Sequence, residues 1–439
     1  MSDRDGGRFS AIVTAATRIE AHELKAAVLS FAFVFILMAA YFILRPVRDA
    51  MSSDWTDVEL STLWTSTFFF SVIAVSVYGG VISRIEFRHL VPGVYGFFAA
   101  TFVAFYFGSS LAENSTGIDK AFYVWLSVFS LFHVSVFWSF MSSLFSREQA
   151  PRVFGFIGAG ASIGAIVGPS VPAFFADDLG TMNLMLIAAV LLLVPIPIIA
   201  QLEKLKASEL GNADLHADLG RQQKLGRNPF SGFMLFVRDP FLLAIGVFIL
   251  LYVVMNTFIY FELRKLMSEF DRDTRTQIWA GIDLAVNSLA IVTAMFATSR
   301  LTTRFGMAAT LALIPVLMVG GWLVVAAVPL LAVLAGMQIA RRAGNYAITR
   351  PGREMLFTQV DAETRFKAKP VIDIVVYRGG DMATAWVYTI LATVFHFGLA
   401  GISVVAAVLA ALWAVAGLYL GRRYTETGER EAEAAASGG

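Results

Sequence analysis

Charged side chains occur inside several long apolar stretches of this sequence, where a charge is costly unless it meets a partner or a ligand. The planar guanidinium of arginine can bind two oxygens of one phosphate or carboxylate, so arginines in such stretches predict an anion site. A carboxylate there needs a cation, water or a proton. We expect anion binding by Arg45, Arg48, Arg341, Arg342, Lys369 and Arg378. We expect gating or ion-pair roles for Asp49, Glu262, Asp283, Asp373 and Asp381.

The first pair of arginines lies at the predicted end of an apolar helix. Arg45 and Arg48 are three residues apart, so they share one helical face, and Pro46 can bend the helix between them. Together they suit a phosphate or carboxylate. The alternative is that both arginines reach out to the membrane surface, with Asp49 as a local partner.

The densest group of charges lies between Arg350 and Asp381. We expect a loop from Arg350 to Lys369, whose basic residues, Arg353 among them, need no role beyond loop charge. An apolar helix then carries the remaining charges. Lys369 and Asp373 are four residues apart and share a face of that helix. Several unlike charges in one apolar span favour a functional site.

Composition sets the class of protein. The chain has 439 residues, of which 57% are hydrophobic and 15% charged, whereas soluble domains carry about 25% charged residues. It is therefore a polytopic helical membrane protein. The net charge of +1 gives no bulk argument for nucleic acid, and the absence of cysteine excludes disulfides and thiol catalysis. Without a metal-ligand cluster or a nucleophile paired with a base, we do not expect an enzyme, a metal or a cofactor.

Twelve apolar runs are long enough to cross a membrane. They are roughly 25–45, 62–82, 89–109, 120–145, 152–175, 182–201, 240–262, 277–299, 306–327, 330–349, 368–395 and 399–421. The expected organisation is a cytoplasmic segment (1–24), a six-helix bundle (25–201), a cytoplasmic linker (202–239), a second six-helix bundle (240–421) and a cytoplasmic tail (422–439).

Loop charge predicts the orientation. Basic residues occupy alternate loops without a break, and the intervening loops lean acidic. By the positive-inside rule both termini are cytoplasmic, and residues 1–24 lack the apolar core of a signal peptide. We expect a multi-pass membrane protein, and the family resemblance described below implies the bacterial inner membrane.

The two halves resemble each other. Ser83-Arg84-x-x-x-Arg88 recurs as Ser299-Arg300-x-x-x-Arg304, an offset of 216 residues (299 − 83). The same offset takes Arg48 to Arg264. Matches at equivalent helix positions are what internal repeats predict. Two parallel six-helix repeats resemble the major facilitator architecture.

Three further features have open interpretations. The small residues of 155–169 predict close helix packing, and the context excludes a dinucleotide loop. His133 is a candidate proton carrier, although a structural histidine is the simpler interpretation. Gly379-Gly380 can break or thin the helix around them.

Three stretches resemble the ATP/ADP translocase (nucleotide transporter) family, and its free-living bacterial members in particular. They are FILRPVRDAM at Phe42–Met51, the region Phe137–Ser162, and RPGREMLF…FKAKPVIDIVVYRGGD at 350–381. The resemblance implies a major facilitator fold and exchange of ATP for ADP or related nucleotides. It implies binding roles for Arg48 and for Lys367 or Lys369. At two positions where the family has acidic residues, this sequence has Leu126 and Ile259.

We therefore expect a monomeric, alternating-access antiporter of a small anionic, phosphorylated metabolite, with ATP-type nucleotides as the family expectation and the lipid bilayer as its other partner. Exchange needs no cofactor, because the counter-substrate resets the carrier. Two alternatives stay open. One is a proton-coupled transporter of another organic anion or a lipid-like molecule, using Asp283, His133 or Glu262. The other is a membrane scaffold or receptor that transports nothing.

Overall fold

Apolar runs without a water partner for the backbone must fold as helices, which satisfy every peptide group internally. The computed structural model of the chain describes residues 19–82, 87–146, 148–212, 231–296, 298–360 and 371–437. The helices of the first half are α2 (Leu24–Met51), α3 (Asp57–Ile82), α4 (Phe87–Leu111), α5 (Thr116–Leu144), α6 (Ala150–Leu179), α7 (Asn183–Leu193) and α8 (Pro195–Ser208), with a 3₁₀ turn η1 (Ser52–Asp54) after α2.

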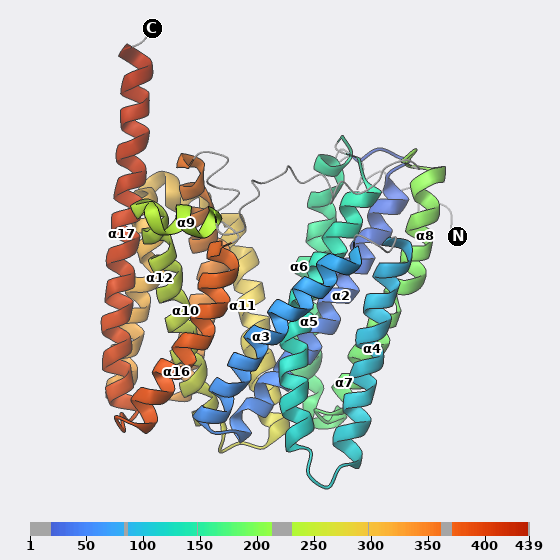
Figure 1. Ribbon diagram of the computed structural model, residues 1–439, viewed down its shortest axis with the longest axis horizontal. Helices are drawn as coiled ribbons and strands as arrows, with labels where there is room; N and C mark the ends of the chain where they lie inside the picture. Colours follow the sequence, from blue (N-terminus) through green and yellow to red (C-terminus); the bar gives the residue numbers. More distant parts are fainter. Residues whose placement is uncertain are drawn as a thin grey trace. The chain divides into compact units, whose positions relative to one another are not determined.

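The second half contains two π-helical segments as well as α-helices (Figure 1). Its elements are α9 (Ser231–Arg238), α10 (Pro240–Met267), α11 (Arg272–Phe296), α12 (Thr298–Ala327), α13 (Leu331–Gly344), π-helical η3 (Asn345–Thr349), α14 (Arg350–Leu356), 3₁₀ η4 (Phe357–Gln359), π-helical η5 (Val371–Gly379), α16 (Gly380–Thr393) and α17 (Leu399–Ser437).

Each of the twelve predicted spans coincides with helix in the described part of the chain. Nine helices there are long and apolar enough to cross a membrane. The other three spans are α3, the run from α13 into η3, and the run from η5 into α16. The all-helical class and the twelve-helix, major facilitator-type fold predicted from the sequence are confirmed.

The helices gather into two compact units. Unit 1 holds the described residues up to Ser52, those from Phe69 to Asn212, and Asp271–Leu284. Unit 2 holds Ser53–Phe68, the described residues from Ser231 to Phe270, and those from Ala285 onward. Each unit thus contains one short segment from the other half of the sequence. The repeat offset of 216 carries residues 53–68 to 269–284, so the two segments are equivalent parts of the two repeats.

Close helix packing in unit 1 explains the predicted stripe of small residues. Gly160, Gly164 and Gly168 of α6 are spaced by four and face the backbone of α2. A methyl group added to Gly164 would lie 2.3 Å from the carbonyl oxygen of Phe35. Only glycine allows this approach, which is the small-residue packing common between membrane helices.

The same device recurs in unit 2, where α17 packs along α12 and then projects beyond the other helices of its unit (Figure 1). A methyl group on Gly421 would lie 2.2 Å from the Cα atom of Ala308, and one on Gly417 would lie 2.9 Å from the carbonyl oxygen of Leu311. Both contacts bring two backbones together, so α12 and α17 form the tightest pair of this unit.

Local signals start the helices of the second half. The Asp239 side chain accepts hydrogen bonds from the backbone N–H groups of Phe241 (2.8 Å) and Leu242 (3.3 Å), with Pro240 at the first position of α10. Asp271 accepts from the Thr274 N–H (2.9 Å) before α11. Hydrogen bonds from Thr274 hold the pKa of the Asp271 carboxyl below its usual value.

Two predicted boundaries are wrong. The first apolar helix was expected to end near residue 45, but α2 continues to Met51, so Arg45 and Arg48 lie within it. The loop expected from Arg350 begins later, because α14 and η4 continue the helical path to Gln359. Gly379 and Gly380 do not interrupt their helix; the π-helical η5 changes to the α-helical α16 there.

Candidate functional site

Among the predicted binding residues that the structure describes, Arg341 of α13 is the most deeply buried, with none of its surface exposed. Its Nη2 donates to Asn256 Oδ1 of α10 (2.6 Å) and to Gln338 Oε1 (2.9 Å). The guanidinium carbon lies 4.9 Å from the centre of the Tyr252 ring. These three partners are neutral, so the hydrogen bonds and the ring contact that the structure describes for Arg341 bring no counter-charge to it.

Two nitrogens of that guanidinium are left over. The Nε and Nη1 atoms of Arg341 are buried and have no hydrogen-bond partner among the described residues, and no ion pair joins Arg341 to a carboxylate there. Burying a charge without a counter-charge costs several kcal/mol, about as much as a small domain's net stability. Such a group persists where it binds a ligand or supports one.

A second arginine stands close by in unit 2. Arg353 of α14 is 5% exposed, and its Nη1 donates to the hydroxyl of Tyr377 (3.1 Å) in η5. The Tyr377 ring contacts that of Tyr252 at 6.1 Å in an edge-to-face arrangement, and Tyr252 also contacts Trp413 at 5.8 Å. These aromatic rings join the surroundings of Arg341 and Arg353 into one cluster. Arg353, predicted to be a loop residue without a further role, therefore belongs to the interior.

The other predicted site residues of unit 2 lie near Arg341 or on η5 and α16, or fall outside the described residues. Arg342 is buried next to Arg341, while Arg378 and Asp381 are half-buried at the junction of η5 and α16. Asp381 interacts electrostatically with Arg378 and Arg341. Asp373 lies in η5, but its side chain and the whole of Lys369 fall outside the described residues.

The two π-helical segments are what position this cluster. A π-turn adds a residue to the helical repeat, which shifts the side chains that follow to a new face. The segment η3 lies between α13, which carries Arg341 and Arg342, and α14, which carries Arg353. The segment η5 carries Tyr377 and Arg378. Such segments are rare and are often found at functional sites.

Unit 1 contains a second charged group, which is balanced. Arg48 of α2 donates to Asp49 Oδ1 from Nη2 (2.6 Å) and to Ser127 Oγ of α5 (3.3 Å), and it lies over the Tyr123 ring at 5.3 Å. Arg45 reaches Asp49 at 3.6 Å and Asp283 at 3.5 Å. Asp283 is brought into the group by the exchanged segment Asp271–Leu284. Two arginines thus face two aspartates.

Glu262 belongs to a third group, in unit 2. It accepts a hydrogen bond from the Tyr388 hydroxyl (2.5 Å), which in turn accepts one from Lys265 Nζ (2.8 Å). Lys265 also pairs with Asp57 (2.9 Å), and Arg264 pairs with the same carboxylate. Asp57 comes from the exchanged segment Ser53–Phe68. Two acids and two bases again balance.

Comparison with known proteins agrees with this fold. The family model of the Major Facilitator Superfamily matches residues 29–347, which is more than half of the chain. The chain belongs to the Major Facilitator Superfamily. None of the curated proteins compared with it matches.

Solved structures of several transporters share the fold of this major facilitator protein. The nucleoside transporter NupG aligns with a TM-score of 0.64 at 13% identity, over 91% of this chain and 99% of that one. A bacterial homologue of the iron transporter ferroportin gives 0.64 at 10% identity, over 92% and 99%. A bacterial homologue of the human lysosomal transporter Spinster gives 0.56 at 12% identity, over 93% and 98%. Family and fold indicate a transporter rather than an enzyme.

His133 of this major facilitator protein lies in the apolar interior of unit 1. Its ring is stacked on Tyr41 at 4.4 Å and lies 5.3 Å from Phe129. It is 4% exposed, and neither ring nitrogen has a hydrogen-bond partner among the described residues. The histidine therefore packs as an aromatic group.

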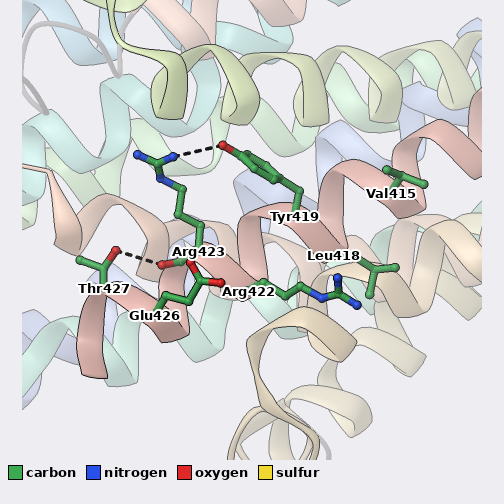
Figure 2. Close-up of a pocket in the computed structure, with 7 residues that line it drawn as sticks. All are labelled: Val415, Leu418, Tyr419, Arg422, Arg423, Glu426 and Thr427. Carbon is green, nitrogen blue, oxygen red and sulfur yellow. Dashed lines mark hydrogen bonds between the residues drawn. The ribbon is translucent and has the colours of Figure 1, made fainter. Parts of the chain in front are cut away.

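A pocket of about 420 Å³ lies along the middle of α17. Figure 2 shows the Arg423 guanidinium turned toward the Tyr419 hydroxyl (3.2 Å) and the Thr427 hydroxyl turned toward the Arg423 carbonyl (2.9 Å). Arg422 and Glu426 offset each other in charge. The residues that line the pocket in the described part of the chain all come from one helix, most of them exposed, so it is a surface groove and not the candidate site.

Sequence reasoning missed the neutral residues of the candidate site. Tyr252 and Asn256 are four residues apart in a strongly apolar helix, a spacing that places two polar groups on one face. This spacing could have identified both residues from the sequence. Arg353 was instead assigned to a loop, because the neighbouring Pro351 and Gly352 are typical of loops.

Proposed function

We propose that the chain is an alternating-access transporter of an anionic, phosphorylated metabolite. The observation that carries the proposal is Arg341, a fully buried guanidinium whose hydrogen bonds in the described part of unit 2 go only to neutral groups. A phosphate that binds in this cluster supplies negative charge where the described arginines outnumber the acids. Binding there is strong because charged hydrogen bonds are strongest where water is excluded.

The charge of the whole cluster supports an anion over a cation or a neutral solute. Arg341, Arg342, Arg353 and Arg378 contribute four positive charges, and among the described side chains around them the acids are Asp381 and the partly exposed Glu354. An excess of positive charge in a low-dielectric region attracts an anion and repels a metal ion. Lys369 and Asp373 are proposed to act in the same site, as substrate-binding and gating residues.

The balanced group of unit 1 is also proposed to bind an anion, in exchange for its internal partners. Arg45 and Arg48 are occupied by Asp49 and Asp283. When an anion arrives, the carboxylates can release the arginines to it, and they take them back when it leaves. The empty carrier is then never left with unpaired arginines in unit 1, and Asp49 and Asp283 act as gating ion pairs.

Nucleotide exchange is the finer form of the proposal. The resemblance to the ATP/ADP translocase family supports antiport of ATP-type nucleotides across a bacterial inner membrane, by a monomer with both termini in the cytoplasm. Exchange needs no cofactor. Leu126 and Ile259 stand where that family has acidic residues. We therefore propose phosphorylated metabolites as the substrate class, and nucleotides are the first of them to test.

Proton-coupled transport of another organic anion is the second candidate, and one observation favours it. His133 is buried without a hydrogen-bond partner for either ring nitrogen among the described residues, so it can accept a proton in another state of the carrier. A scaffold without transport is disfavoured, because a scaffold gains nothing from a buried arginine whose described hydrogen bonds go only to neutral groups.

The test is thermal stabilisation of the purified, full-length protein by a panel of nucleotides, other phosphorylated metabolites, organic acids without phosphate, and lipids. A ligand at one hundred times its Kd stabilises the folded state by about 2.7 kcal/mol. The proposal expects phosphorylated compounds to raise the melting temperature and the other classes to leave it unchanged. If only compounds without phosphate raise it, the proposal is wrong.

A further inference from the structure

The orientation of the Asn256 side-chain amide is dictated by Arg341. A guanidinium can only donate hydrogen bonds, so the atom 2.6 Å from Arg341 Nη2 must be the Oδ1 oxygen of Asn256. The amide nitrogen then points away from Arg341. Asn256 is half-buried, and its Nδ2 has no hydrogen-bond partner among the described residues. The two N–H groups of the Asn256 amide are therefore available to donate to a ligand, and the buried positive charge of Arg341 lies on the other side of the same amide.

Tyr377 is oriented by Arg353 in the same way. Arg353 Nη1 donates to the Tyr377 hydroxyl oxygen (3.1 Å), so the hydroxyl hydrogen remains available to donate elsewhere. Tyr377 is half-buried, whereas Arg353 is 5% exposed. As with Arg341 and Asn256, the buried guanidinium of Arg353 donates a hydrogen bond to a neutral group, the Tyr377 hydroxyl, which can still donate its own hydrogen to a ligand.

The two donors belong to one cluster. Tyr252 and Asn256 are four residues apart on α10, and the Tyr252 ring contacts both the Arg341 guanidinium and the Tyr377 ring. A hydrogen-bond donor polarised by a neighbouring cation is stronger than a neutral one, and such effects accumulate along a chain in a low dielectric.

We propose that Asn256 Nδ2 and the Tyr377 hydroxyl bind the oxyanion of the substrate directly, with Arg341 and Arg353 behind them as positioning residues. This inference rests on the proposed function and names the groups that recognise the anion. The ligand class is an oxyanion rich in acceptor lone pairs, phosphate before carboxylate. Neutral donors hold such a group without the tight ion pair that would slow its release.

The experiment measures the Kd of inorganic phosphate by thermal-shift titration of the full-length protein and its variants. Asn256→Asp is close in size to the wild type but replaces the N–H donors with a carboxylate, and it should weaken binding by about tenfold or more. Tyr377→Phe removes only the hydroxyl and should weaken binding by about tenfold. Tyr377→Phe also serves if Asn256→Asp fails to fold.

Gln338→Glu is the matched control. Gln338 also accepts a hydrogen bond from Arg341 Nη2, and it is 2% exposed. This variant brings the same new charge to Arg341 but leaves the Asn256 donors in place, so we expect it to lose clearly less phosphate affinity than Asn256→Asp.

Three results would separate the explanations. Weaker phosphate binding by Asn256→Asp than by Gln338→Glu, together with weak binding by Tyr377→Phe, supports direct recognition by the two donors. Equal losses in Asn256→Asp and Gln338→Glu overturn it, because the charge of Arg341 alone would then explain both. Wild-type binding by Asn256→Asp and Tyr377→Phe also overturns it. A wild-type protein that no phosphorylated compound stabilises would instead contradict the proposed function.

Discussion

Replacing Arg341 with methionine should separate the stability of this carrier from its function. The substitution removes a fully buried charge whose desolvation costs several kcal/mol. It also removes two charge-assisted hydrogen bonds, worth about 1.5–3 kcal/mol each, and a ring contact worth about 0.5–2 kcal/mol. Since methionine fills much of the same volume, these losses and gains nearly cancel, and the melting temperature without ligand should stay the same or rise.

The affinity for the ligand, in contrast, should fall strongly in Arg341→Met. A loss of about 2.7 kcal/mol of binding free energy weakens the Kd a hundredfold. At a ligand concentration that was one hundred times the original Kd, stabilisation then falls from about 2.7 to about 0.4 kcal/mol. The assay is a thermal-shift titration of both proteins with the same phosphorylated ligand. Arg341→Lys keeps the positive charge but loses the planar guanidinium that can bind two oxygens at once. Its Kd for the ligand should lie between those of the wild type and Arg341→Met.

One outcome would refute this reasoning. If Arg341→Met unfolds several degrees earlier without ligand, and the ligand still stabilises it as strongly as the wild type, then Arg341 serves the fold. Its unsatisfied Nε and Nη1 would then be a tolerated cost and not the mark of a binding site.

The remaining predictions concern contacts between helices. The hydroxyls of Ser61 and Thr389 lie 2.7 Å apart, so cysteines at both positions in this cysteine-free chain should form a disulfide of about 2.05 Å. Because both positions belong to unit 2, exchange should continue in the oxidised protein, and loss of exchange that reduction restores would show that α3 and α16 must separate. Gly164→Ala should destabilise the protein by about 1–3 kcal/mol, whereas Gly158→Ala, with no atom within 4 Å of the added methyl group, should match the wild type in a melting assay. Asp283→Asn should lower the melting temperature by the equivalent of about 1–3 kcal/mol, and an unchanged value would mean that the contact with its arginine partner contributes nothing.

The helices of this protein could be predicted because apolar length is a strong local signal in a membrane. Charge was a poorer guide to where helices end. Arg45, Arg48 and Asp49 suggest the edge of the bilayer, yet α2 continues through them, because these charges satisfy one another and Asp283 inside unit 1. Their partner lies more than two hundred residues away in the chain, beyond the reach of any spacing argument.

The second wrong boundary has a physical cause in the π-helix. Proline breaks an α-helix because it lacks the N–H that the preceding turn needs. Pro351 stands at the start of α14, directly after the π-helical η3, where the wider turn changes the hydrogen-bond pattern. The helix therefore carries on past the proline and takes Arg353 into the interior.

The candidate site was only half visible in the sequence. Buried arginines such as Arg341 stand out, because charge in an apolar span is rare. Their neutral partners do not stand out. Asn256 and Gln338 matter because α10 and α13 bring them to one guanidinium, and that pairing depends on how the helices pack.

The most direct test of the account is counterflow in proteoliposomes that contain the purified protein. Vesicles are loaded with an unlabelled phosphorylated metabolite that stabilises the protein, and uptake of the labelled compound is followed with and without a protonophore. The account predicts uptake that depends on the internal compound, ignores the protonophore, and disappears in Arg341→Met. Uptake that needs no internal compound and is abolished by the protonophore, or exchange by Arg341→Met at the wild-type rate, would contradict it.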